Sequence, residues 1–346
     1  MNMTGIEALE LGEAYQAELT RRYGNEALER VDAGLGSVEL PHREGETLTT
    51  LRLQPDTPIH DRRVLYVPGF TEDVLPKIPF ALELEKLGLD VTFLGQNRRG
   101  ISRNASGRPD ATYSQAVNNL AVLEAAGLQD GPVDPLLHSY ASLIFQAMMR
   151  ETKERGRSTF DDSRVVMLAP AGSNPFESPL TLGPRFGRHG WTESRTDKDF
   201  PDPDGVMLKA GIDTFTANWP RSIREMLELS FDRVNYPWLL DSGISSLAIL
   251  GYGGDKLFPH RTLKRSMQKM TNHAEDKRAE ADETGVDDIV SVQYATPIDY
   301  ERRKDRSEGE SKHVVRNPKN ASHNDEQFHP SRVAGSVAQL LRLAAA

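Results

Sequence analysis

The sequence predicts an α/β fold in which helices flank a mostly parallel central sheet. Short apolar runs of four or five residues alternate with longer segments whose apolar residues recur at helical spacing. Gly88 and Gly127 directly follow two of these segments, where a residue with positive φ commonly closes a helix. Because parallel strands need a long crossover connection, usually a helix, this alternation favours a sheet covered on both faces.

The elements are predicted in the following order. An amphipathic surface helix is expected over residues 4–31, followed by strands at 37–40 and 47–53 that a hairpin-like turn joins. The remaining strands are expected to be buried, at 63–67, 90–94, 133–137, 164–168 and 247–250, with a further candidate at 313–316. Helices are expected at 78–87, 113–126, 220–232 and 330–343, besides one directly after residue 140.

Two segments interrupt the alternation. Residues 171–240 are rich in Pro, Gly and aromatic residues and fall between two core strands, so we expect a helical lid over the carboxyl end of the sheet. Residues 273–312 are heavily charged, which predicts a solvated helix and loops. The chain therefore divides into an N-terminal helical extension, a core in two pieces and a lid insertion, at residues 1–35, 36–170 with 241–346, and 171–240.

Composition excludes several classes of protein. The 346-residue chain has a formal net charge of -9, whereas general nucleic-acid binding needs a basic face. There is no cysteine, which excludes disulfides, cysteine-ligated metals and a cysteine nucleophile. The first residues are acidic, unlike a signal peptide, and no run approaches the roughly 18 apolar residues of a membrane span. We expect a cytoplasmic protein with no integral membrane span and no nucleic-acid partner; the oligomeric state stays open.

Ser139 is the candidate nucleophile. It follows the apolar run 133–137, and a helical pattern begins directly after it. A serine on a sharp turn from strand to helix presents its hydroxyl and the following backbone N–H groups, the geometry of a nucleophile elbow. The G-x-S-x-G pattern of such elbows has Leu137 and Ala141 in its glycine positions. Taken alone, the string also fits an ordinary serine at a helix start.

An acid and a base follow in the order that acyl transfer at this serine needs. Asp255 lies in a glycine-containing loop after the strand at 247–250, where it suits either an orienting carboxylate or a helix cap. His323 precedes the C-terminal helix and follows the candidate strand at 313–316.

The developing oxyanion would need two hydrogen-bond donors. The backbone N–H groups of Phe70, after the strand at 63–67, and of Tyr140, after the nucleophile, are the predicted donors.

Over most of residues 36–343 the chain resembles the α/β-hydrolases of the single-polypeptide lipase and esterase type. The order Ser139, Asp255, His323 is the order of that fold. Four further segments resemble its oxyanion loop, the turn after the next strand, its acid loop and its histidine loop: YVPGF at 66–70, NRRGIS at 97–102, GYGGDKLFP at 251–259 and SHND at 322–325. The resemblance implies an α/β-hydrolase fold and a lipase-like serine hydrolase that cleaves a carboxylic ester through an acyl-enzyme on Ser139.

The sequence leaves alternatives open. The bulky Leu137 would also suit a catalytically inactive binding module, and the same three residues serve hydrolases of thioesters or C–C bonds. The expected partner is a small-molecule acyl substrate, whose apolar portion would contact lid aromatics. Those aromatics are Phe176, Phe186, Trp191 and Trp219. Neither a cofactor nor a metal is expected, because the glycines at 251–254 lack the dinucleotide spacing and the histidines lack metal-ligand spacing.

Overall fold

The structure, a computed structural model, describes most of the chain. Residues 13–40, 46–70, 72–96, 110–129, 132–173, 219–252, 291–295 and 323–343 are described continuously, as are shorter stretches and single positions within 182–216 and 255–279. Within these residues lies one eight-stranded sheet of order β1-β2-β4-β3-β5-β6-β7-β8. The strands are β1 (Leu35–Glu39), β2 (Thr47–Leu53), β3 (Arg63–Val67), β4 (Val91–Leu94), β5 (Val133–His138), β6 (Arg164–Leu168), β7 (Ser246–Leu250) and β8 (Ser291–Ala295).

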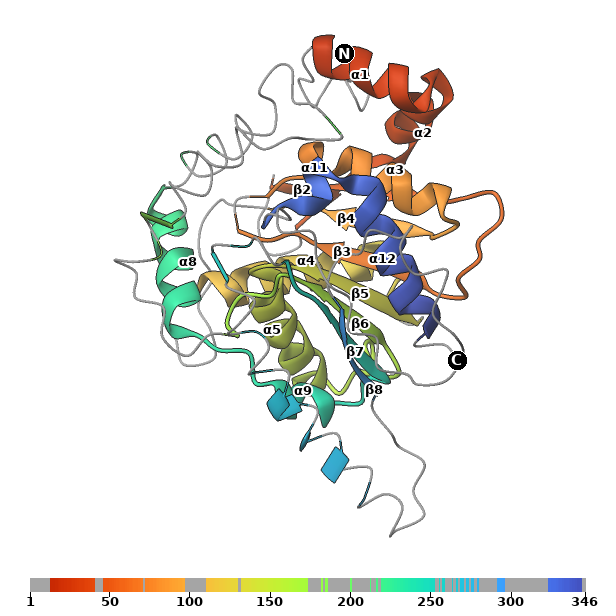
Figure 1. Ribbon diagram of the computed structural model, residues 1–346. Coiled ribbons are helices and arrows are strands. Elements are labelled where there is room, and N and C mark those ends of the chain that lie inside the picture. The colour runs from red at the N-terminus through yellow and green to blue at the C-terminus, as the bar shows by residue number, and fades with distance from the viewer. Residues whose placement is uncertain are drawn as a thin grey trace.

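The predicted mostly parallel sheet is confirmed. β2 runs antiparallel to both β1 and β4, and every neighbouring pair from β4 to β8 is parallel. Parallel strands end at a common edge, so the segments that follow β3, β5, β6 and β7 leave the sheet on the same side (Figure 1).

Helices cover both faces of the sheet (Figure 1). α4 (Ala111–Ala125), α5 (Ala141–Glu154) and α9 (Tyr236–Leu240) contribute to the core on one face, and α8 (Trp219–Phe231) packs against α4. The core on the other face includes residues of α1 (Glu13–Tyr23), α2 (Asn25–Gly34), α3 (Ile78–Lys86) and α12 (Pro330–Leu343). Two short elements, η2 (Leu75–Lys77) and α11 (Asp325–Phe328), precede α3 and α12.

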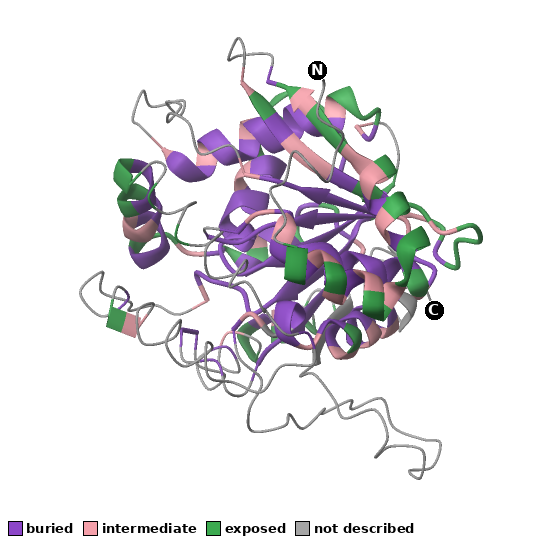
Figure 2. Ribbon diagram, turned by 90° about the horizontal axis from the view of Figure 1, so that it is seen from above, coloured by how far each residue is buried: buried purple, intermediate pink, exposed green. Residues whose placement is uncertain are grey.

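The alternation of side chains along a strand explains the two cores. In β3, Val64 and Tyr66 belong to one core, and Leu65 and Val67 belong to the other. All four are fully buried, and Figure 2 shows the central strands as buried. A strand with two buried faces reads as a continuous apolar run, which is why these strands could be predicted from composition alone.

The prediction of one helix over residues 4–31 is wrong. α1 and α2 are separate helices that meet at Gly24, which has a φ of 83°. Glycine adopts this conformation without strain, so the amphipathic pattern continues across a break in the backbone. Residues 4–12 lie outside the described residues.

The prediction of only helix and loops over 273–312 is also wrong, because β8 lies in this segment. β8 pairs with β7 and ends the sheet, and an edge strand does not need a run of apolar residues. The candidate strand at 313–316 lies outside the described residues, as does most of 174–218. The lid and the division into domains therefore stay predictions. No described helix is long and apolar enough to cross a bilayer.

Candidate active site

Ser139 lies at the turn between β5 and α5 with a φ of 53°. A residue other than glycine rarely adopts this left-handed conformation, which costs on the order of 1–3 kcal/mol. Hydrogen bonds to neighbouring segments hold it: the Ser139 N–H donates to the Leu168 carbonyl (2.9 Å), and the Ser139 carbonyl accepts from the Ala171 N–H (3.0 Å). The Ser142 hydroxyl donates to the same carbonyl (2.8 Å). The end of β6 thus holds the strained turn.

The two elbow positions that lack glycine are accommodated. Leu137 and Ala141 are both fully buried in the core on the α4 and α5 face. The backbone of Ser139 adopts its left-handed conformation beside a leucine side chain that packs into the core.

A chain of hydrogen bonds joins the three predicted triad residues. His323 Nε2 lies 2.9 Å from Ser139 Oγ, and His323 Nδ1 lies 2.8 Å from Asp255 Oδ2. All three residues are buried, although 184 and 68 positions separate His323 from Ser139 and Asp255. A carboxylate accepts, so Nδ1 carries the proton in this arrangement and Nε2 is free to accept the hydroxyl proton of Ser139.

Backbone N–H groups hold the carboxylate of Asp255, the predicted acid, in place. Asp255 Oδ1 accepts hydrogen bonds from the N–H groups of Leu257 (2.7 Å) and Phe258 (3.0 Å). The Phe258 ring packs against the His323 ring, with 5.2 Å between the ring centroids. One oxygen of the carboxylate therefore faces the backbone and the other faces the imidazole.

The loop after β3 lies against Ser139, the predicted nucleophile. A Cβ atom added at Gly69 would lie 3.0 Å from Ser139 Cβ and 3.0 Å from the His138 carbonyl oxygen, so a side chain here would press on the elbow and glycine avoids this crowding. Phe70, one of the two predicted oxyanion donors, follows in this loop and is buried. Tyr140, the other, is the N-cap of α5.

Comparisons with known proteins bear on the fold. No protein-family model matches the chain, and no curated protein matches it. Among solved structures, a membrane phospholipase A described as a bacterial virulence factor is similar over 98% of this chain and 96% of its own, with 15% identity and a TM-score of 0.58. A thermophilic esterase from Thermogutta terrifontis (13% identity, 90% of this chain and 99% of its own, TM-score 0.53) is also similar. So is an α/β-hydrolase fold protein from Chitinophaga pinensis (10% identity, 90% and 98%, TM-score 0.53).

The chain has the α/β-hydrolase fold. Identities this low show the architecture alone, because one fold hosts many activities.

Sequence reasoning missed a cluster of ionisable side chains that lies behind the triad. Glu72, Lys77, His138 and Glu326 are all buried. Lys77 Nζ lies 2.8 Å from Glu72 Oε1 and 2.5 Å from Glu326 Oε1, and His138 Nδ1 lies 2.5 Å from Glu72 Oε1. The one local signal was His138, directly before the nucleophile. Only the fold brings the other three to it.

The charges of this cluster stabilise one another. Burial alone would raise the pKa of Glu72, but the positive charges of His138 and Lys77 hold that pKa well below its ordinary value. Burial alone would likewise lower the pKa values of Lys77 and His138, whereas the carboxylates of Glu326 and Glu72 raise both. The surrounding charges therefore favour the ionised forms of Glu72, Lys77 and His138.

Ligand atoms of Glu72, His138 and Glu326 lie within 4.8 Å of one another, the arrangement of a small metal site. The Lys77 ammonium, however, lies within hydrogen-bond distance of both carboxylates. The positive charge that the two carboxylates attract is therefore that of the Lys77 ammonium.

The predicted lid aromatics are only partly described. Trp219 lies at the start of α8 with 61% of its surface exposed, more than an apolar pocket wall would leave accessible. Phe176, Phe186 and Trp191 lie outside the described residues. Their contact with substrate stays a prediction.

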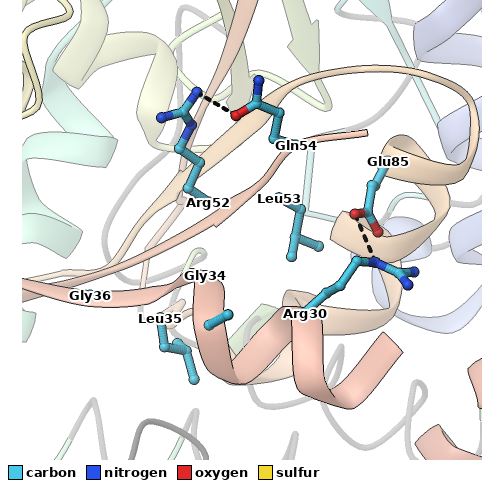
Figure 3. Close-up of a pocket in the computed structure, with 9 residues that line it drawn as sticks. Arg30, Gly34, Leu35, Gly36, Arg52, Leu53, Gln54 and Glu85 are labelled. Atoms are coloured by element: carbon cyan, nitrogen blue, oxygen red, sulfur yellow. Dashed lines mark hydrogen bonds and ion pairs between the residues drawn. The ribbon is translucent and has the colours of Figure 1, made fainter. Parts of the chain in front are cut away.

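An open cavity of about 450 Å³ lies away from the triad, lined by residues of α2, β1, β2 and α3. Its two arginines already have partners: Arg30 pairs with Glu85 and Arg52 bonds to Gln54 (Figure 3). No triad residue lines this cavity, which makes it a poor candidate for the active site of this α/β-hydrolase fold.

Proposed function

We propose that the protein is a serine hydrolase that cleaves a carboxylic ester, or a related acyl bond, through an acyl-enzyme on Ser139. The observation that carries the proposal is the hydrogen-bonded chain from Ser139 through His323 to Asp255, with the serine on a strained elbow. A serine hydroxyl is a weak nucleophile until an oriented base accepts its proton. The two distances, 2.9 and 2.8 Å, lie within the range that such transfer requires.

In the proposed reaction, Ser139 Oγ attacks the substrate carbonyl carbon while its proton passes to His323 Nε2. Asp255 stabilises the resulting imidazolium and keeps it oriented. The N–H groups of Phe70 and Tyr140 would stabilise the oxyanion of the tetrahedral intermediate. The intermediate collapses as His323 returns the proton to the leaving oxygen, which leaves the acyl group on Ser139. Water then attacks the acyl-enzyme, with His323 as the base again.

The elbow geometry favours an enzyme over an inactive binding module. A binding protein would gain nothing from holding Ser139 at a φ of 53°. The solved esterase and phospholipase A with this fold are compatible with an ester substrate. We propose a small-molecule ester with an apolar acyl portion, which the predicted lid aromatics other than the exposed Trp219 would contact.

A fluorophosphonate probe tests the proposal, since it reports an activated serine whatever the substrate. We expect it to label the wild-type protein and to leave Ser139→Ala unlabelled. Hydrolysis of a p-nitrophenyl ester should fall by roughly 1,000-fold or more in that variant. Ser336→Ala, on α12, removes a hydroxyl whose hydrogen bond is to the Arg332 carbonyl and is the matched control. Equal labelling of the wild type and Ser139→Ala would refute the proposal.

A further inference from the structure

The buried ionic cluster contacts every loop that carries a proposed catalytic group. Glu72 lies in the loop after β3, Lys77 ends η2, His138 directly precedes Ser139, and Glu326 lies on α11. These segments are far apart in the chain; Lys77 and Glu326, for example, are 249 positions apart. The cluster is thus a place where the separate catalytic loops are joined to one another.

His138 lies between a backbone carbonyl and a carboxylate. Its Nε2 atom lies 2.9 Å from the carbonyl oxygen of His323, which can only accept a hydrogen bond. Its Nδ1 atom lies 2.5 Å from Glu72 Oε1, a carboxylate oxygen. Nε2 therefore donates to this carbonyl, whereas the Nδ1 contact is an ion-pair contact that lacks hydrogen-bond geometry. Because the carboxylates of Glu326 and Glu72 raise the pKa of His138, we assign its ring as an imidazolium. With Lys77 it balances the charges of Glu72 and Glu326.

Hydrogen bonds from Glu72 hold the predicted oxyanion loop, residues 66–70. Glu72 Oε2 accepts the N–H of Gly69 (2.5 Å) and the hydroxyl of Tyr66 (3.2 Å). On the other side of the loop, Gln96 Nε2 donates to the Gly69 carbonyl. That carbonyl and the Phe70 N–H belong to one planar trans peptide group and point in opposite directions. Glu72 and Gln96 together therefore set the direction of the Phe70 N–H.

His138 and Glu326 hold the loops of the proposed base, His323, and the proposed acid, Asp255. His138 donates to the backbone carbonyl of His323 itself, and their ring centroids are 4.9 Å apart. Glu326 Oε2 accepts the hydroxyl of Tyr252 (3.2 Å), and the Tyr252 carbonyl accepts the N–H of Asp255 (3.1 Å). The loops of His323 and Asp255 thus share one buried ionic anchor with the oxyanion loop.

We propose that Glu72 is a positioning residue for the reaction. Its carboxylate holds the oxyanion loop through Gly69, and through the His138 imidazolium it fixes the loop of the catalytic histidine. The inference rests on the proposed function, because it assigns the cluster a role in that same site. Glu72 contacts neither the substrate nor the reacting atoms.

Kinetics of Glu72→Gln test this role. The variant keeps the shape of the side chain and removes one of the two carboxylate charges, those of Glu326 and Glu72, that raise the pKa of His138. We expect kcat for a p-nitrophenyl ester to fall roughly 10- to 100-fold with KM within about threefold, because a misplaced donor and base affect the transition state more than substrate binding. The matched control is Glu85→Gln, which removes another buried, ion-paired carboxylate, in the cavity beside α2, and should change kcat by less than about twofold.

The same experiment separates the two proposals. Absence of fluorophosphonate labelling in the wild type overturns the proposed function and this role together. Normal wild-type labelling with an unchanged kcat in Glu72→Gln, or an equal loss in Glu85→Gln, overturns the positioning role alone.

Nuclear magnetic resonance of the wild-type protein with ¹⁵N-labelled histidine measures the protonation of His138 directly. This test does not depend on whether a Glu72 variant folds. We expect both ring nitrogens of His138, assigned by their absence in His138→Gln, to have the shifts of an imidazolium at pH 8. A neutral His138 ring at that pH would overturn the inference.

Discussion

The residues on either side of Ser139 are anchored to two buried glutamates, and the two anchors differ. His138, which precedes Ser139, contacts Glu72 in the ionic cluster. The hydroxyl of Tyr140, which follows Ser139, donates to Glu228 Oε2 (2.9 Å), on α8. Both carboxylates are 6% exposed. The difference between them lies in what compensates the charge.

Neutral donors and a helix terminus compensate the charge of Glu228. It accepts the N–H groups of Ala111 (3.0 Å) and Thr112 (2.9 Å), the first residues of α4, where the helix dipole favours an anion. The hydroxyl of Thr112 donates as well. Its ionic partner Arg224 has a side chain that is 44% exposed, whereas the Lys77 side chain in the Glu72 cluster is fully buried.

This contrast separates two roles for a buried carboxylate. The Glu72 cluster lies wholly within the core and joins loops that must keep a fixed distance. Glu228 lies on α8, in the segment predicted to form the lid, and joins that segment to the elbow. One anchor joins the loops of the proposed catalytic groups, and the other joins the elbow to the predicted lid segment.

Removing the buried cation should have the largest effect on stability. Lys77→Met leaves two buried carboxylates with a single imidazolium, and breaking a buried ion pair in this way costs about 3–5 kcal/mol. Urea denaturation should show this loss of unfolding free energy. Arg224→Met removes the exposed partner of Glu228 and should cost less than about 1 kcal/mol. Equal losses in the two variants would show that the two anchors do not differ as described.

A smaller effect is expected on the other side of the nucleophile. Glu228→Gln replaces one acceptor oxygen with a donor that faces the N–H groups of α4, and we expect a loss of about 1–3 kcal/mol. Amide exchange in α8 should become faster, since this carboxylate joins α8 to α4. Tyr140→Phe removes only one of the hydrogen bonds to Glu228 and should leave that exchange closer to the wild type. Unchanged exchange in Glu228→Gln would disprove the connection.

The smallest predicted effect depends on pH. Burial, followed by the charges of Glu228 and Asp110, raises the pKa of Asp232 from 3.8 to about 6. The folded pKa lies above the unfolded one, so ionisation opposes folding, and stability is lost as the pH rises from about 4 through 6. Asp232→Asn should therefore stabilise the protein at pH 8, by at most about 1 kcal/mol because solvent reaches this side chain.

Thermal unfolding of Asp232→Asn at pH 5 and pH 8 checks this prediction. The gain should shrink at the lower pH, and Asp56→Asn, at an exposed position between β2 and β3, is the control. A gain that is the same at both pH values would exclude titration of Asp232 as its cause.

The sequence determined much of the fold because each buried parallel strand is a short continuous run of apolar residues. β3 and β6 have the predicted bounds, since burial of both faces demands a continuous apolar run. The catalytic candidates were also local signals: Ser139, Asp255 and His323 each stand at the end of a predicted strand or in a loop that resembles a known motif. The structure brings these three together in one hydrogen-bonded chain.

Only the tertiary structure decided the surroundings of those residues. Glu72, Lys77 and Glu326 look like ordinary surface charges in the sequence, because an ion pair between distant segments leaves no periodic pattern. The break at Gly24 leaves the helical spacing of apolar residues unchanged, and β8 is a short alternating stretch inside a heavily charged segment, so both were missed. Patterns of burial are local and can be read from the chain, whereas pairing between charges depends on which loops the fold brings to the same edge of the sheet.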